Sequence, residues 1–203
     1  MLFLESHARV LVVLHAILGA ATVAATTHCF AWTWRFPRGN FSRFHGARWL
    51  ATTALVLYAA QFVLGNLMYP VYKVRVRAEF LDLPSAVAEE AKVRQAARDL
   101  VDDRRRAEPG GAQSHVGPSR RVEAPRGLSH IARLFDIKEH WAALGLVLAL
   151  ATCLLTWGWN PHKDGPGGSR LILVLSAGAA TCAWFAGVVG IICSSFRSMG
   201  GVL

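Results

Sequence analysis

Residues 128–159 read LSHIARLFDIKEHWAALGLVLALATCLLTWGW, and this stretch changes character about a third of the way along. Its first part places apolar residues at helical spacing among charged ones: Ile131, Leu134, Phe135 and Ile137. From Trp141 to Trp159 there is no acidic or basic side chain. The pattern predicts one helix that begins amphipathic and then enters a membrane.

Three further apolar blocks resemble this one in length and composition. The chain is 53% hydrophobic and 17% charged, and its apolar residues gather at 10–34, 49–70, 141–159 and 171–196. Each block approaches the roughly 20 residues that a helix needs to cross a bilayer core. We therefore predict an all-α integral membrane four-helix bundle, multi-pass in a bacterial-type inner or plasma membrane.

The predicted spans divide the chain into three parts. Residues 1–70 form a first helical hairpin, and residues 128–203 form the amphipathic helix that enters the membrane and a second hairpin. Residues 71–127 form a large extramembrane loop. Within this loop we expect an extended segment at 71–83, a helix at 85–106 rich in Ala, Glu and Arg, and a flexible linker at 108–127 rich in Pro and Gly.

Charge and cysteine usage exclude several classes of protein. The formal charge is +9, but the arginines flank the apolar blocks or lie in the long loop, so nucleic-acid binding is not expected. The four cysteines all lie in predicted spans without a C-x-x-C motif. They predict packing residues and not a zinc site, a disulfide framework or covalently attached haem.

Polar and small residues predict which faces of the spans contact protein. In the first span a polar stripe falls on one helical face: His15, Gly19, Thr22, Thr26, Cys29 and Thr33. This stripe should face the bundle, because lipid offers polar groups no hydrogen-bond partner. In the second span Gln61 and Asn66 lie about 140° apart on the wheel and so call for two neighbouring structures. The fourth span carries small residues at helix-contact spacing: Ala179, Ala183 and Gly187.

Histidine is the residue type in this sequence that most suggests a functional site. His15 and His140 each lie 19 residues before the tryptophan that closes their span, Trp34 and Trp159. Because the first and third spans run parallel, the two imidazoles are predicted at a similar depth. Two such imidazoles are what bis-histidine ligation of one b-type haem iron requires, and Gly19 would leave room for a porphyrin face. His28 is rotated about 140° from His15 and should point elsewhere.

A structural role explains the same histidines equally well. His140 can be a polar residue of the membrane interface beside Trp141, and His15 can hydrogen-bond Asn66 or Tyr69 on the second span. Lys138 and Glu139 can pair with Arg75 or Arg77 at the surface.

Two functional hypotheses follow from these observations. The first is a non-enzymatic accessory or scaffold component of a membrane assembly, with the lipid bilayer and other membrane subunits as its partners. The alternative is a single-haem electron-transfer subunit that uses His15 and His140. We identify no catalytic motif, and no span carries the mid-depth breaks typical of transporters. The basic short loops favour a cytoplasmic position for 35–48 and 160–170, with both termini outside.

Overall fold

The computed structural model describes residues 7–107, 129–161, 163–164 and 167–196, and these residues form helices without any strand. The elements are α1 (Ala8–Thr33), the 3₁₀ turn η2 (Phe36–Arg38), α2 (Phe44–Val71), the π-helix η3 (Tyr72–Leu81), α3 (Pro84–Ala107), α4 (Ser129–Gly158) and α5 (Gly167–Phe196). The all-α fold predicted from the sequence is confirmed.

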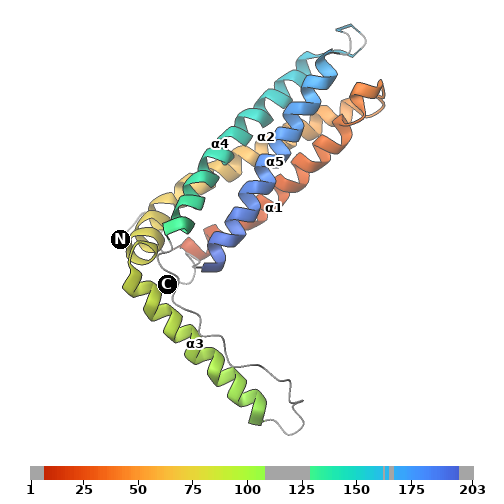
Figure 1. Cartoon of the computed structure of the whole chain (residues 1–203). Coiled ribbons are helices and arrows are strands. Elements are labelled where there is room, and N and C mark those ends of the chain that lie inside the picture. Colours follow the sequence, from red (N-terminus) through yellow and green to blue (C-terminus); the bar gives the residue numbers. More distant parts are fainter. Residues whose placement is uncertain (1–6, 108–128, 162, 165–166, 197–203) are drawn as a thin grey trace.

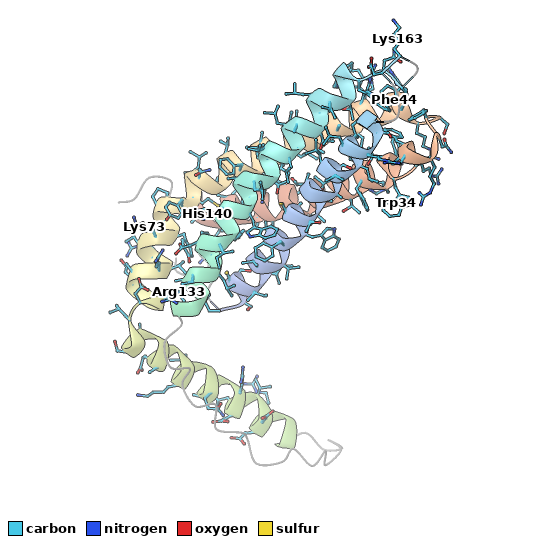
Figure 2. The ribbon with its side chains drawn as sticks, turned by 45° about the horizontal axis from the view of Figure 1, so that its top comes forward. Trp34, Phe44, Lys73, Arg133, His140 and Lys163 are labelled. Atoms are coloured by element: carbon cyan, nitrogen blue, oxygen red, sulfur yellow. The ribbon has the colours of Figure 1, made fainter. Side chains whose placement is uncertain are left out.

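Four of the helices form an antiparallel bundle (Figure 1). Helix α1 packs against α2 and α5, and α4 packs against the same two helices, so the four form a ring. The end of α2, η3 and the start of α4 lie together at one end, which we name the α3 end. Figure 2 shows Lys73, Arg133 and His140 toward the α3 end, and Trp34, Phe44 and Lys163 at the other.

All four bundle helices are long and apolar enough to cross a membrane. The candidate spans run Ala8–Arg38, Phe44–Glu79, Ile131–Gly158 and Gly167–Ser195. They contain the four predicted blocks, apart from the last residue of the third block and the last residue of the fourth. Helix α4, which forms the third span, is continuous from Ser129 through its apolar part, as the change of character within 128–159 predicts.

The prediction of an extended segment at 71–83 is wrong. Helix α2 passes through Pro70 and continues directly into η3, which ends at Leu81. In η3 the side chains of Tyr72, Val76 and Leu81 are buried against Ile131 and Ala132 of α4. This packing against α4 overrides the two-residue alternation of basic and apolar residues that favoured an extended chain.

Small and polar side chains fill the interior of the bundle, and large apolar side chains cover its outside. The predicted stripe of α1 faces the interior, where four of its residues are almost fully buried: Thr22, Thr26, Cys29 and Thr33. Large apolar side chains point outward instead, among them Val13, Val63, Val147, Leu154 and Val174. This arrangement suits lipid, because helices in a bilayer associate through close packing of small residues.

Close packing continues on α5. Ala179 and Ala183 are buried, and a Cβ added at Gly187 would lie 3.7 Å from Val23 of α1. The predicted small-residue contact of the fourth span is therefore confirmed. Across the same interface the hydroxyls of Thr33 and Ser176 lie 2.8 Å apart in a hydrogen bond.

An arginine closes the end of the bundle opposite to α3. Arg48 of α2 donates from Nε to the carbonyl of Thr156 at 2.8 Å and from a terminal nitrogen to that of Trp159 at 3.2 Å. Carbonyls in the last turn of a helix have no partner within the helix, so a cation there both pairs with them and complements the helix dipole. Phe36 and Trp159 pack in an aromatic cluster beside it.

Helix α3 projects away from the bundle, starting at the end of the bundle named the α3 end (Figure 1). It covers Pro84–Ala107, one residue more at each end than the predicted helix. Its main contact within the described residues is with η3. The predicted flexible linker at 108–127 lies outside the described residues.

Candidate functional site: a polar cluster inside the bundle

The α3 end of the bundle holds a cluster of polar side chains in its interior. His15 of α1 and Gln61 of α2 meet there, with Nε2 of the imidazole 3.0 Å from Nε2 of the amide. Lys138 of α4 reaches toward α5 at the same end of the bundle, where its Nζ lies against Gly190. We name His15, Gln61 and Lys138 the polar cluster.

The depth of this cluster follows from its distance to the tryptophans at the opposite end. Nineteen residues separate His15 from Trp34 and Lys138 from Trp157. At 1.5 Å per residue this is about 28 Å, close to the roughly 30 Å thickness of a bilayer core. If these tryptophans mark one interface, the cluster lies near the other boundary of the hydrocarbon.

Three glycines make room for the three polar side chains. A Cβ added at Gly19 would lie 3.1 Å from Nε2 of Gln61, and one at Gly65 would lie 3.3 Å from Cε1 of His15. A Cβ added at Gly190 of α5 would lie 3.1 Å from Nζ of Lys138. All four bundle helices therefore contribute to the site, through either a polar side chain or a glycine.

The cluster contains polar atoms without partners. Nδ1 of His15 and Oε1 of Gln61 are buried and make no hydrogen bond. In the described part of the chain Lys138 makes no hydrogen bond and no ion pair within 4.0 Å. Buried polar groups are paired in most proteins, so an accumulation of unpaired ones indicates a site that binds something.

Donors outnumber acceptors among these atoms. An amide nitrogen can only donate, so Nε2 of His15 accepts from Gln61 and the ring proton of the neutral imidazole sits on Nδ1. The Lys138 ammonium adds further donors and no acceptor. Gln61 Oε1 is the unpaired atom that can only accept.

An ordered layer of charged and aromatic residues lies beside the cluster. Arg77 of η3 donates to Oδ1 of Asp136 in α4 at 2.9 Å, and Tyr72 stacks on Phe135 with ring centroids 3.7 Å apart. The sequence left either Arg75 or Arg77 as a partner for Lys138 and Glu139, whereas Arg77 pairs with Asp136. Arg75 pairs with Glu79 within η3. These contacts fix η3 against α4.

The two histidines singled out in the sequence have different surroundings. His15 faces the interior, where Gln61 and not Asn66 or Tyr69 is its partner. His140 is exposed, and its Nδ1 lies 2.8 Å from the backbone carbonyl of Asp136 in its own helix. The space beside Gly19 holds the Gln61 amide. Haem ligation by His15 and His140 stays a prediction, which requires Gln61 to withdraw and His140 to turn inward.

The remaining polar residues of the spans are satisfied locally. His28 is exposed and its Nδ1 lies 3.0 Å from the carbonyl of Ala24, so it points away from the interior as predicted. Asn66 is also exposed and donates to the carbonyl of Phe62. Helix α2 contacts two neighbouring helices, α1 and α4, as predicted, but Asn66 depends on neither, because its own helix supplies the acceptor. No group of three or more His, Cys, Asp or Glu side chains that could hold a metal ion occurs among the described residues.

Sequence reasoning missed Gln61 and Lys138 as members of one site. The available signal was the placement of Gly19 and Gly65 near polar residues in two adjacent spans. Without the register of α1 against α2, that signal does not identify which polar residue meets His15.

Helix α3 offers a second surface with functional potential. Three of its apolar side chains are 60–71% exposed: Val93, Leu100 and Val101. At 100° per residue these three lie within one third of the helix circumference. The polar residues Asp99 and Asp102 lie on the opposite side, so α3 presents an uncovered apolar stripe.

Comparison of the chain with protein-family models, with curated proteins and with solved structures gave no match. The fold itself defines the class: a multi-pass helical membrane protein with four spans, an internal polar cluster and one projecting helix.

Proposed function

We propose that this protein is a non-enzymatic accessory or scaffold component of a membrane assembly, in which the bundle is the anchor and α3 is the arm that binds a partner protein. The observation that carries the proposal is the exposed apolar stripe on a 24-residue helix that projects from the bundle. We place the assembly in a bacterial-type inner or plasma membrane.

Physical chemistry supports a partner for α3. Val93, Leu100 and Val101 would each gain about 1.5–3 kcal/mol if fully buried, and nothing in the described chain buries them. An amphipathic helix that lays such a stripe into an apolar groove is a common recognition mode. Charged residues on the other side of α3, such as Asp99 and Asp102, keep the free helix soluble.

Site-specific photo-crosslinking in intact membranes tests this proposal. A photoreactive amino acid at Leu100 should give a discrete protein adduct. The same amino acid at Asp102, about 160° away on the wheel, is the matched control and should give little. When the photoreactive residue stands at Val93, the additional change Leu100→Glu should abolish the adduct, because it introduces a charge into the apolar contact. Equal adducts from Leu100 and Asp102, or lipid adducts alone, would contradict a partner-binding arm.

The single-haem alternative has its own test. His15 supplies the observation that favours it, since its imidazole is directed into the bundle with an unpaired ring nitrogen. Detergent-purified protein with a low-spin b-type haem would show a sharp reduced absorption band, and His15→Ala would remove it. If the purified protein is folded and colourless, the haem alternative is rejected and only the scaffold proposal remains.

A further inference from the structure

Lys138 differs from the other lysine at the α3 end of the bundle. Lys73 of η3 is exposed, as a basic residue at a membrane interface usually is (Figure 2). Lys138 is turned inward instead, and its ammonium lies where Gly190 of α5 has no side chain. Phe135 lies below it, with the ring centroid 5.3 Å from Nζ.

No carboxylate of the described residues forms an ion pair with Lys138. The nearest carboxylates by sequence are Asp136 and Glu139, but Asp136 is bound to Arg77, and no ion pair within 4.0 Å joins Glu139 to Lys138 in the described chain. On the facing helix α5 the residue that lies against Nζ of Lys138 is Gly190, which has no side chain to pair with it. A cation in this setting calls for an anion from outside the chain.

The position of the cluster restricts what that anion can be. The depth estimate puts it near a boundary of the hydrocarbon, where lipid phosphates lie. Lys138 and Gly190 are both partly exposed, so the ammonium is reachable between α4 and α5. Basic pockets between membrane helices are typical binding sites for anionic lipid head groups.

We propose that the polar cluster binds a phosphate group, with the Lys138 ammonium as the main donor and His15 Nδ1–H as the second. Gln61 is a positioning residue, because its hydrogen bond to Nε2 keeps the proton of His15 on Nδ1. The phosphate belongs either to an anionic phospholipid or to a free phosphate ester. An uncharged carbonyl ligand would leave the lysine charge uncompensated.

Native mass spectrometry of the detergent-purified full-length protein tests the proposal. The wild type should retain phosphatidylglycerol much better than phosphatidylcholine. Lys138→Met, which keeps the length of the side chain, should weaken phosphatidylglycerol binding by about tenfold or more, as expected for loss of a charge-assisted hydrogen bond. Lys73→Met removes an equal charge at the same end and is the matched control, with binding expected to stay within about twofold of wild type.

Two further arms complete the design. Glycerol 3-phosphate added at the same concentration as phosphatidylglycerol identifies the source, since competition indicates a free phosphate ester and failure to compete indicates the lipid. Thermal unfolding without lipid shows whether Lys138→Met is folded, and Lys138→Gln replaces it otherwise. Unchanged binding in the Lys138 variant, an equal loss in Lys73→Met, or equal retention of phosphatidylcholine would each overturn the proposal.

Discussion

His15 and Gln61 form a hydrogen bond of 3.0 Å between α1 and α2, although 46 residues separate them in the sequence. Each side chain lies against a glycine of the other helix: Gly65 faces the imidazole and Gly19 faces the amide. The two glycines allow the helices to approach closely enough for the bond to form. This hydrogen bond therefore links the first two spans in one specific register. It also fixes the imidazole tautomer that the proposed phosphate site needs.

Replacement of Gln61 by leucine should destabilise the bundle. The change leaves both nitrogens of His15 buried without a partner. Hydrogen bonds between membrane helices contribute on average about 0.6 kcal/mol, with a maximum near 1.7, so we expect a loss of about 0.6–2 kcal/mol. Unfolding of the purified protein by SDS in mixed micelles measures it.

Asn66→Leu is the matched control for this experiment. Asn66 belongs to the same helix but is exposed, and it donates only to the carbonyl of Phe62. Its replacement should leave the free energy of unfolding nearly unchanged. If Asn66→Leu lowers the free energy of unfolding as much as Gln61→Leu does, the loss comes from a change in α2 itself and not from the hydrogen bond to His15.

Gly145 of α4 should tolerate no side chain. A Cβ at this position would collide with the hydroxyl of Tyr58 and lie 2.8 Å from Cβ of Cys182. We expect Gly145→Ala to cost about 1–3 kcal/mol through overpacking. Tyr58→Phe in the same chain should recover part of this loss, because it removes the colliding hydroxyl.

The same SDS titration applied to Gly158→Ala provides the comparison. No atom lies within 4 Å of the Cβ position at Gly158, which is also in α4. Alanine there should be neutral or slightly stabilising, since its helix propensity exceeds that of glycine by up to about 1 kcal/mol. Equal destabilisation by the two alanines would show that close packing at Gly145 is not the cause.

The contact between η3 and α4 should depend more on stacking than on charge. Tyr72 is buried and lies nearly parallel to the Phe135 ring, at an interplanar angle of 14°. Tyr72→Ala should therefore cost about 3–5 kcal/mol, as for other large aromatic truncations. Asp136→Asn breaks an ion pair whose side chains are 32% and 38% exposed, and such pairs contribute about 1 kcal/mol or less.

Hydrogen exchange of the η3 amides distinguishes the two contributions. Tyr72→Ala should increase exchange throughout η3, while Asp136→Asn should change it little. The reverse order would mean that the Arg77–Asp136 pair, and not the aromatic stack, holds η3 on α4.

The sequence was sufficient for the fold because lipid makes its pattern simple. A span must be apolar and about 20 residues long whatever its neighbours are, so 10–34 or 171–196 can be recognised from composition alone. The inward face of α1 was also predictable, since Thr22 and Thr26 have no hydrogen-bond partner in lipid.

The site was less predictable because it depends on register between helices. The depth of His15 was inferred from Trp34, but its partner depends on how α1 slides against α2, which no single span encodes. Pro70 was interpreted as the end of a helix, whereas packing of Tyr72 and Val76 against α4 carries the helix onward. Tertiary contacts thus decided both of these points.

The last prediction concerns the two sides of the membrane. Four spans place α3 and the turn between α4 and α5 on opposite sides, and the basic short loops favour a cytoplasmic position for that turn. A cysteine at Lys92 of α3 should therefore react with a membrane-impermeant maleimide in intact cells. A cysteine at Lys163 should react only after permeabilisation. Both replaced side chains are exposed.

The native chain is the background control for this labelling, since Cys29, Cys153 and Cys182 are buried and Cys193 is partly buried. The reverse pattern, with Lys163→Cys labelled in intact cells, would invert the orientation but keep the four spans. Reaction of both cysteines from the same side would contradict the four-span topology itself. In that case the depths of His15 and Lys138, and the phosphate site that rests on them, would have to be abandoned.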